Sequence, residues 1–307
     1  MSQYIMHHIT PESPLWPERM APLPGMPHEL YYIGSLPEEH TPTIGIIGSR
    51  LCSSYGHRTA EEFARAFASR GVQTISGMAV GIDGYAQEAT LQAGGKSFAV
   101  LGSGADVCYP PGNGRLYDEL CLRGGVISEL KPGTPPRGPN FASRNRIISA
   151  LSDILLVVEA KMKSGTNITV EFALSQGKTV YAVPGRVGDH LSDGCNYLIS
   201  QGAGIAFSPE AVLSELGLVS SFSFGRETKA AEAGRRKKDR DLAADQAISL
   251  EERDICRGLS FEDPLPPDAL ARSLSLPVSR VLAALTDLVL RGYAEEPVRG
   301  LYIRKRR

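Results

Sequence analysis

From Thr43 onward the sequence alternates between short apolar runs and longer amphipathic stretches, and this alternation is the strongest constraint on the fold. The first run is Ile44-Gly45-Ile46-Ile47, and Gly, Ser or Pro residues separate it from the next amphipathic stretch. Strands that alternate with helices of roughly 10–12 residues are typical of βαβ units, which have right-handed crossovers and a mainly parallel sheet. The sequence therefore predicts an α/β domain over residues 41–217.

The strands of this domain are expected at 44–47, 72–75, 97–101, 126–130, 154–159, 179–183 and 204–207. Helices are expected at 59–70, 83–92, 115–122, 166–176, 197–201 and 209–216, with another across Arg144. Thr59-Ala60-Glu61-Glu62 has the pattern of a capping box, and Asp83 is expected to be a helix N-cap.

Three further segments flank or follow this domain. Residues 1–40 are rich in proline and contain the only tryptophan, so we expect an extended arm that packs on the core through Trp16, Leu30, Tyr31, Tyr32 and Ile33. Residues 218–246 lack apolar periodicity and are expected to be a linker. Its basic run, 235–240, is a solvated segment or, alternatively, a phosphate contact.

Residues 247–307 predict a small winged-helix domain of three helices and a hairpin. The apolar residues at helical spacing that should form its core are Leu270, Leu274, Val281, Leu285, Leu288 and Tyr293. Only Arg272, Arg280 and Arg291 lie near its helices, which is a thin basic face for binding duplex DNA.

Composition indicates a cytoplasmic globular protein. The 33 basic and 34 acidic residues nearly cancel, so any surface for nucleic acid has to be local. The five cysteines include no C-x-x-C pair, which argues against a disulfide framework or a zinc site. No secretory leader is recognisable and no apolar run is long enough to cross a membrane, so no membrane partner is expected.

Small residues follow the strands at the edge where parallel sheets bind ligands. The strand ends are 48–50 (Gly-Ser-Arg), 76–77 (Ser-Gly), 102–104 (Gly-Ser-Gly), 164–166 (Ser-Gly-Thr) and 184–186 (Pro-Gly-Arg). Open backbone N–H groups with hydroxyls and arginines beside them are suited to anions. Each turn could need its glycine only for tight geometry, but together they favour a ligand that carries phosphate.

The segment from Phe141 to Ser149 places Arg144, Asn145 and Arg146 at the expected start of an apolar helix. Guanidinium groups beside the free N–H groups of a first helical turn could bind phosphate, and Phe141 could stack on a base. The alternative is that these arginines are solvated or paired with acidic residues.

Common enzyme motifs are absent. The run Gly102-Ser103-Gly104 has Val107 where a dinucleotide fold needs its third glycine, and neither Gly-Lys-Thr nor Gly-Lys-Ser completes a P-loop. Asp189, His190 and Asp193 could bind a metal by composition, but nothing in their spacing fixes a geometry. We therefore expect no cofactor, no metal and no catalytic residue.

Together these motifs resemble the bacterial family of DNA-processing protein A (DprA, also called Smf). The resemblance covers roughly Leu15 to Leu216, with a weaker one over the winged helix. It is carried by 45–50, 76–83, 141–152, 164–166 and 181–185, and by the arm segments 15–17 and 31–34.

The resemblance implies a Rossmann-like, doubly wound sheet that binds single-stranded DNA without catalysing a reaction. It also implies a homodimer that helps the recombinase RecA load on incoming DNA during natural transformation. By resemblance, Ser49 and Arg50 would contact phosphate and Phe141 would line the path of the strand. With the strand-end and motif residues, the candidate DNA-binding residues are Gly48, Ser49, Arg50, Ser76, Gly77, Phe141, Arg144, Asn145, Arg146, Ser164, Gly165 and Thr166.

This sequence departs from the family pattern at Val80, where most members have a basic residue; Arg137 or Lys161 could replace it. Two other functions stay open. One is a related hydrolase of nucleoside monophosphates, with Glu171 as the catalytic carboxylate, although the double glycine of such enzymes is missing before Thr166. The other is a regulator that binds DNA through the winged helix.

Overall fold

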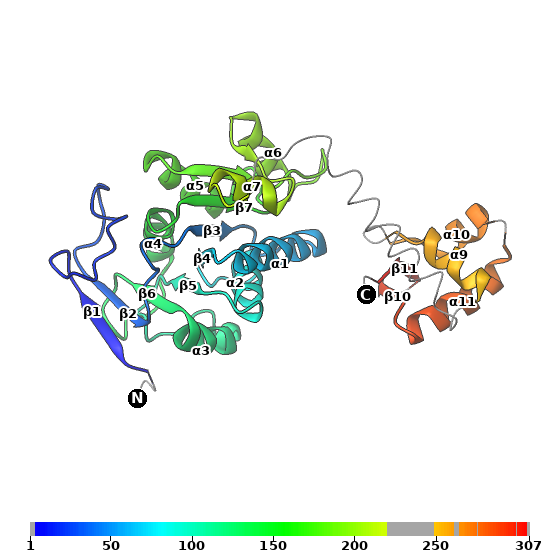
Figure 1. Ribbon diagram of the computed structural model, residues 1–307, viewed down its shortest axis with the longest axis horizontal. Coiled ribbons are helices and arrows are strands. Elements are labelled where there is room, and N and C mark those ends of the chain that lie inside the picture. Colours follow the sequence, from blue (N-terminus) through cyan, green and yellow to red (C-terminus); the bar gives the residue numbers. More distant parts are fainter. Residues whose placement is uncertain (1–3, 220–248, 261–263, 275, 299, 306–307) are drawn as a thin grey trace. The chain divides into compact units, whose positions relative to one another are not determined.

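A computed structural model describes residues 4–219, 249–260, 264–274, 276–298 and 300–305 of the chain. The chain divides into two compact units, Met1–Phe222 and Ser223–Arg307 (Figure 1). The expected linker falls almost entirely outside the described residues, and with it the basic run at 235–240.

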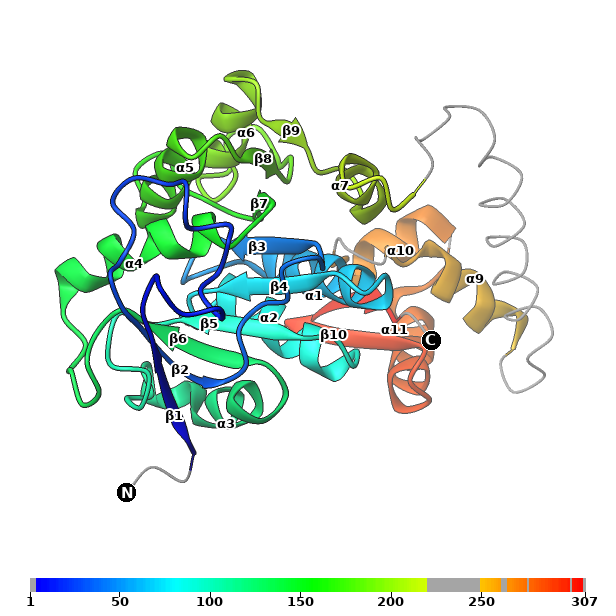
Figure 2. The same ribbon diagram turned by 60° about the vertical axis from the view of Figure 1, so that its left-hand side comes forward.

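The described part of the first unit contains a sheet with the strand order β1-β2-β6-β5-β4-β3-β7-β8-β9 (Figure 2). All neighbouring strands from β6 to β9 are parallel, whereas β1 and β2 run antiparallel to their neighbours. The strand bounds are β1 (Met6–Ile9), β2 (Leu30–Gly34), β3 (Thr43–Ile47), β4 (Gln73–Ser76), β5 (Ser97–Val100), β6 (Gly125–Ser128), β7 (Ile154–Val157), β8 (Thr179–Ala182) and β9 (Gly204–Ile205).

The strand order reverses beside β3. Strands β4, β5 and β6 follow on one side of β3, and the chain then crosses to β7 on its other side. In open parallel sheets, such a reversal leaves a crevice at the carboxyl ends of the two strands, where ligands bind.

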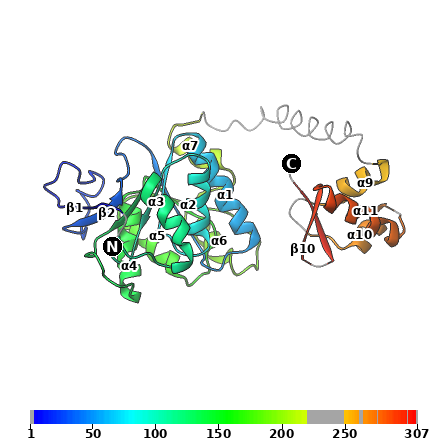
Figure 3. The same ribbon diagram turned by 90° about the horizontal axis from the view of Figure 1, so that it is seen from below.

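Helices cover both faces of this sheet (Figure 3). One core joins α4, α5 and α6 to the sheet, and another joins α1, α2 and α7 to its opposite face. The helix bounds are α1 (Ser54–Ser69), α2 (Ile82–Gln92), the short 3-10 turn η1 (Pro111–Asn113), α3 (Gly114–Arg123), α4 (Gly138–Ala150), α5 (Gly165–Ser175), α6 (Asp193–Ser200) and α7 (Pro209–Glu215).

The N-terminal segment is part of the sheet, which the sequence did not indicate. Its strands β1 and β2 pair with each other, and β2 extends the sheet beyond β6. Leu30, Tyr32 and Ile33 of β2 are buried, as is Trp16 in the loop between the strands. The prolines that suggested an extended arm lie mainly in that loop, away from the hydrogen-bonded strands.

Two expected helix starts were wrong. Helix α1 begins at Ser54, because the Ser53 hydroxyl accepts a hydrogen bond from the Gly56 N–H at 3.1 Å and caps the helix. Thr59 is buried inside that helix instead of capping it. Helix α2 has Gly81 as its N-cap, with a φ of 83°, and Asp83 is buried in the first turn.

The second unit contains α9 (Leu250–Gly258), α10 (Pro267–Leu274), α11 (Val278–Leu290) and the hairpin β10 (Ala294–Val298) and β11 (Leu301–Arg304). The predicted core is confirmed: Leu270, Val281, Leu285, Leu288 and Tyr293 are buried together, and Leu274 packs against them. Among the described residues, no single helix is long and apolar enough to cross a membrane; α10 and α11 would meet that threshold only as a pair, which is bent by 115°.

Candidate nucleic-acid interface

A cavity of about 420 Å³ lies at the reversal point of the sheet. Its walls come from the loop after β3, from Ala79 and Asp83 after β4, from α4, and from the segment that joins β7 to α5. The residues expected to contact DNA that line it are Gly48, Ser49, Arg50, Phe141, Arg144, Asn145, Ser164, Gly165 and Thr166. Segments more than 100 residues apart in the chain therefore meet at one edge, as parallel strand ends should.

Arg50 supplies one cation to this cavity. It is exposed, and its guanidinium carbon lies 5.8 Å from the centroid of the Phe141 ring, within range of a cation–π contact. Its neighbour Ser49 donates its backbone N–H to the carbonyl oxygen of Glu159 at 2.8 Å. The loop is thus attached to the end of β7 while the Arg50 side chain stays available to a ligand.

The Glu159 side chain holds the other end of the same loop, at Ser53. Its carboxylate is only 1% exposed and accepts hydrogen bonds from the Ser53 N–H at 2.9 Å and the Ser53 hydroxyl at 2.5 Å. Gly56 lies so close that a Cβ there would be 2.3 Å from a carboxylate oxygen. Glu159 therefore connects the β3 loop and the start of α1 to β7, and sequence analysis had recognised only a strand end.

The amino end of α5 forms the opposite wall. Ser164 is the N-cap in an extended conformation, and its side chain makes no capping hydrogen bond within the described chain. Gly165 and Thr166, at the positive dipole end of this helix, line the cavity. Lys161 lines the same wall and is exposed. This wall combines helix dipole and side-chain charge in the way that anion sites do.

Arg144 does not lie at a helix entrance, so that expectation was wrong. Helix α4 begins at Gly138, which places Arg144 in its second turn, and the residue is only 5% exposed. Its guanidinium donates to the carbonyl of Gly77 at 2.8 Å and to that of Val100, and its Nε donates to Asn145 Oδ1 at 3.0 Å. Through these bonds the Arg144 guanidinium connects the ends of β4 and β5.

A buried carboxylate accompanies Arg144. Asp83 accepts a hydrogen bond from the Gly77 N–H at 3.1 Å. Burial raises the pKa of Asp83, and the charge of Arg144 opposes that rise. Burial and, to a smaller extent, repulsion from Arg50 lower the pKa of Arg144 to about 10, against the attraction of Asp83. The two groups form the floor of the cavity.

Three other expected residues, Ser76, Gly77 and Arg146, do not line the cavity. The Ser76 hydroxyl is buried and donates to the Ile46 carbonyl at 2.6 Å, and Gly77 is buried under Arg144. Arg146 forms an ion pair with Glu129 at 2.5 Å, both side chains being less than 20% exposed. Arg146 is therefore paired with an acidic residue, which was the alternative to phosphate binding.

The remaining strand ends are closed by the protein itself. The Ser103 hydroxyl donates to the Val107 carbonyl at 2.9 Å, and the Gly185 N–H donates to Asn196 at 3.1 Å. Gly102 lies under Phe141, because a Cβ there would be 2.7 Å from the ring. Of the five turns, those after β3 and β7 line the cavity, together with Ala79 and Asp83 after β4 and the face of α4.

Comparison with known proteins agrees with this architecture over nearly the whole chain. A model of the family described as DNA recombination-mediator protein A matches residues 7–217, and one of the DprA winged helix domain matches residues 238–296. The chain belongs to the DprA family. It is 36% identical over 303 residues to protein Smf of Escherichia coli K12, covering 98% of this chain and 78% of that protein.

Further DprA relatives are similar in sequence and in structure. The DNA processing protein DprA of Streptococcus pneumoniae R6 is 44% identical over 186 residues, which cover 61% of this chain and 66% of that protein. The X-ray structure of DprA from S. pneumoniae matches with a TM-score of 0.66, at 37% identity over 72% of this chain and 75% of that one. DprA from Helicobacter pylori, studied for its single-stranded DNA binding mode, matches with a TM-score of 0.64, at 28% identity over 70% of this chain and 97% of that one.

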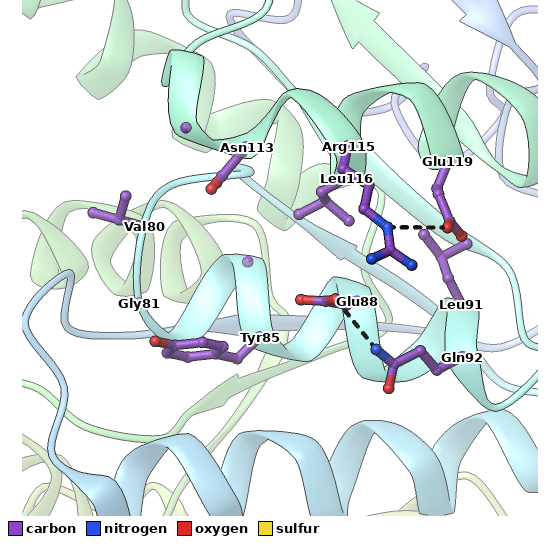
Figure 4. Close-up of a pocket in the computed structure, with 12 residues that line it drawn as sticks. Val80, Gly81, Tyr85, Glu88, Leu91, Gln92, Asn113, Arg115, Leu116 and Glu119 are labelled. Atoms are coloured by element: carbon purple, nitrogen blue, oxygen red, sulfur yellow. Dashed lines mark hydrogen bonds and ion pairs between the residues drawn. The ribbon is translucent and has the colours of Figure 1, made fainter.

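Within this DprA-family chain, Val80 faces a different cavity from Arg50. A groove of about 330 Å³ runs between α2 and α3, and Val80 lies at one end of it (Figure 4). Arg115 and Glu88 point into this groove from opposite helices. Lys161 lines the main cavity, whereas Arg137, the N-cap of α4, precedes the cavity residue Gly138. Of the two basic residues that could replace the one missing at Val80, only Lys161 lines the main cavity.

Residues that would support other functions lie elsewhere. Glu171 is exposed on α5 and is not among the residues that line the main cavity. His190 pairs with Asp193 at 3.2 Å, but within the described ranges no three His, Cys, Asp or Glu side chains are placed to hold a metal. In the winged helix, Arg280 pairs with Glu251, and Arg291 lies 3.5 Å from Asp287.

Proposed function

We propose that this DprA-family chain binds single-stranded DNA at the cavity beyond the carboxyl ends of β3 and β7. One observation carries the proposal: Arg50, Lys161, the amino end of α5 and the ring of Phe141 all line this cavity. Cations and helix N–H groups bind phosphate, and an aromatic ring stacks on a base of any identity. Such contacts follow the backbone and the flat face of a base, so binding is independent of sequence.

The protein acts as a recombination mediator and not as an enzyme. Its partners are single-stranded DNA and the recombinase RecA, which it helps to load on incoming DNA during natural transformation in the cytoplasm. It works as a homodimer. Family membership supports this role, as does the single-stranded DNA binding mode described for the H. pylori relative.

The test compares fluorescently labelled oligo-dT with a duplex of equal length at several salt concentrations. We expect tighter binding to the single strand and an affinity that falls steeply with salt, because phosphate contacts release counterions. Equal or tighter binding to duplex, or an affinity independent of salt, would contradict the proposed site. RecA filament formation on the same oligo, with and without the protein, tests mediation separately.

A second experiment tests whether the winged helix carries the DNA contact. The second unit has its own core, so a protein that ends near Leu218 should remain folded. We expect it to bind oligo-dT within a few-fold of the full chain. A folded first unit that no longer binds would move the site to the second unit or to residues 219–248.

A further inference from the structure

An aromatic ring that sequence analysis did not consider lies next to Phe141. The Tyr109 and Phe141 ring centroids are 5.3 Å apart, with an interplanar angle of 34°. Tyr109 is 40% exposed, and within the described chain its hydroxyl makes no hydrogen bond. It does not line the 420 Å³ cavity, so it lies just beyond the ring that does.

The loop that presents Tyr109 is fixed on both sides. Before it, the Val107 carbonyl accepts from the buried Ser103 at 2.9 Å. After it, the Asn113 N–H donates to the Pro110 carbonyl at 3.0 Å, and the Asn113 side chain donates to the Met78 carbonyl at 2.9 Å. Met78 has a φ of 53°, so this contact also holds an uncommon backbone conformation. A partly exposed ring on such a loop loses little entropy when it binds a flat ligand.

We infer that Tyr109 is a second nucleobase platform, so that Phe141 and Tyr109 bind neighbouring bases of one strand. The inference rests on the proposed binding of single-stranded DNA. The separation of the rings exceeds the roughly 3.4 Å per nucleotide of a duplex strand. Bases placed on the two rings would therefore not stack on each other as neighbouring bases of a duplex strand do.

The competing explanation is that Tyr109 only supports Phe141. Tyr109→Phe and Tyr109→Leu separate the two roles, because both keep apolar packing but only phenylalanine keeps a flat face. We expect Tyr109→Phe to bind a short oligo-dT like the wild-type protein. Tyr109→Leu should bind it roughly 5- to 150-fold more weakly, the range for one stacked base. Tyr197→Leu, a half-exposed tyrosine on α6, is the matched control and should have no effect.

An abasic scan of the oligonucleotide distinguishes the two roles, because a Tyr109 that only supports Phe141 would not have a base of its own. Oligo-dT of about six nucleotides, within the usual site sizes, carries one abasic nucleotide at each position in turn. The wild-type protein should lose affinity at two adjacent positions, and Tyr109→Leu should be insensitive at one of them. Melting temperatures of all variants check that they are folded.

The outcomes separate this inference from the function on which it rests. If the wild-type protein does not bind oligo-dT, both are wrong. If the wild-type protein binds and Tyr109→Leu binds equally well, only the second platform is wrong. The same conclusion follows if Tyr109→Leu binds weakly but still loses affinity at both abasic positions, since Tyr109 would then act only through Phe141.

Discussion

Arg50 and Arg144 line the same cavity, yet the protein uses them in opposite ways. Arg50 follows β3 and is exposed, whereas Arg144 lies inside α4 and bonds to two backbone carbonyls. Both are arginines in motifs that suggest phosphate binding. The comparison shows that the position of a charge within its element, more than its residue type, decides whether it can reach a ligand.

The difference follows from how each element is held. The β3 loop is attached to Glu159 through the N–H groups of Ser49 and Ser53 and the Ser53 hydroxyl, so the Arg50 side chain is not needed to fix it. Helix α4 packs Ile147 and Ile148 against the sheet, which turns Arg144 toward the ends of β4 and β5. A guanidinium buried there has to satisfy its donors within the protein.

The largest expected effect is on stability, from Arg144→Ala. The substitution removes donors from two carbonyls and leaves the carboxylate of Asp83 buried without its cationic neighbour. We expect a loss of about 3–5 kcal/mol of unfolding free energy, the scale for breaking a buried charge pair. Urea denaturation measures it.

The control for this variant removes both charges. Arg144→Ala combined with Asp83→Asn should recover part of the lost stability, because no charge is then left alone in the interior. If Arg144→Ala unfolds at the same urea concentration as the wild-type protein, Arg144 is not the buried support described above and its contrast with Arg50 disappears.

The second effect is on binding, from Arg50→Ala. Loss of a charge-assisted hydrogen bond to phosphate should weaken oligo-dT binding by about 1–3 kcal/mol. The melting temperature should not change, because Arg50 is exposed. Arg50→Lys should restore only part of the affinity, since an ammonium lacks the bidentate fork.

Arg70 provides the matched control for Arg50. It is exposed at the end of α1, directly before β4 and so at the amino end of the strands. Arg70→Ala removes the same charge from the opposite edge of the sheet, so its effect on affinity should be far smaller. Equal losses from the two variants would indicate a general effect of net charge.

A pH effect should separate the buried pair from the exposed arginine. Because the native pKa of Asp83 is raised by burial, the native state binds more protons than the unfolded state between the two pKa values. This contribution to stability is fully present below the unfolded pKa of about 3.9 and is lost as pH rises through the native pKa.

The measurement compares the unfolding free energy of wild type and Asp83→Asn across acid and neutral pH. Asp83→Asn should lack the pH-dependent contribution of Asp83. The difference in unfolding free energy between the two proteins should therefore change between the unfolded and the native pKa of Asp83. Arg50→Ala should follow the wild-type curve in parallel. A difference between wild type and Asp83→Asn that stays constant with pH would contradict the raised pKa.

The sequence predicted the sheet and the ends of β3 and β7 because these depend on local patterns. Alternating apolar runs mark strands. Gly48 to Arg50 directly follow the run that becomes β3, and Ser164 to Thr166 come a few residues after the run that becomes its neighbour β7. The role of Arg144 depended on where α4 starts. Pro139, which suits the first turn of a helix, was the available signal for an earlier start.

Other parts of the site depend on contacts that no local pattern reveals. Glu159 bonds to Ser53 across 106 residues of sequence, and Tyr109 meets Phe141 only because the loop after β5 lies beside the amino end of α4. The strand β2 pairs with β6, about 95 residues later in the chain. Periodicity identifies which residues are apolar, but partners at such distances are set by the whole fold.

The smallest expected effect, and the one that sharpens the comparison most, is that of Lys161→Ala. Lys161 lines the same cavity as Arg50 and forms no ion pair within the described chain. As a flexible point charge it should contribute mainly through counterion release. The slope of log affinity against log salt should then fall by about 0.7 for a single strand. Lys163→Ala is the control, since Lys163 is exposed two residues later but does not line the cavity. If both variants change the slope equally, the loop acts through its overall charge, and the wall that Lys161 lines is not a defined phosphate site.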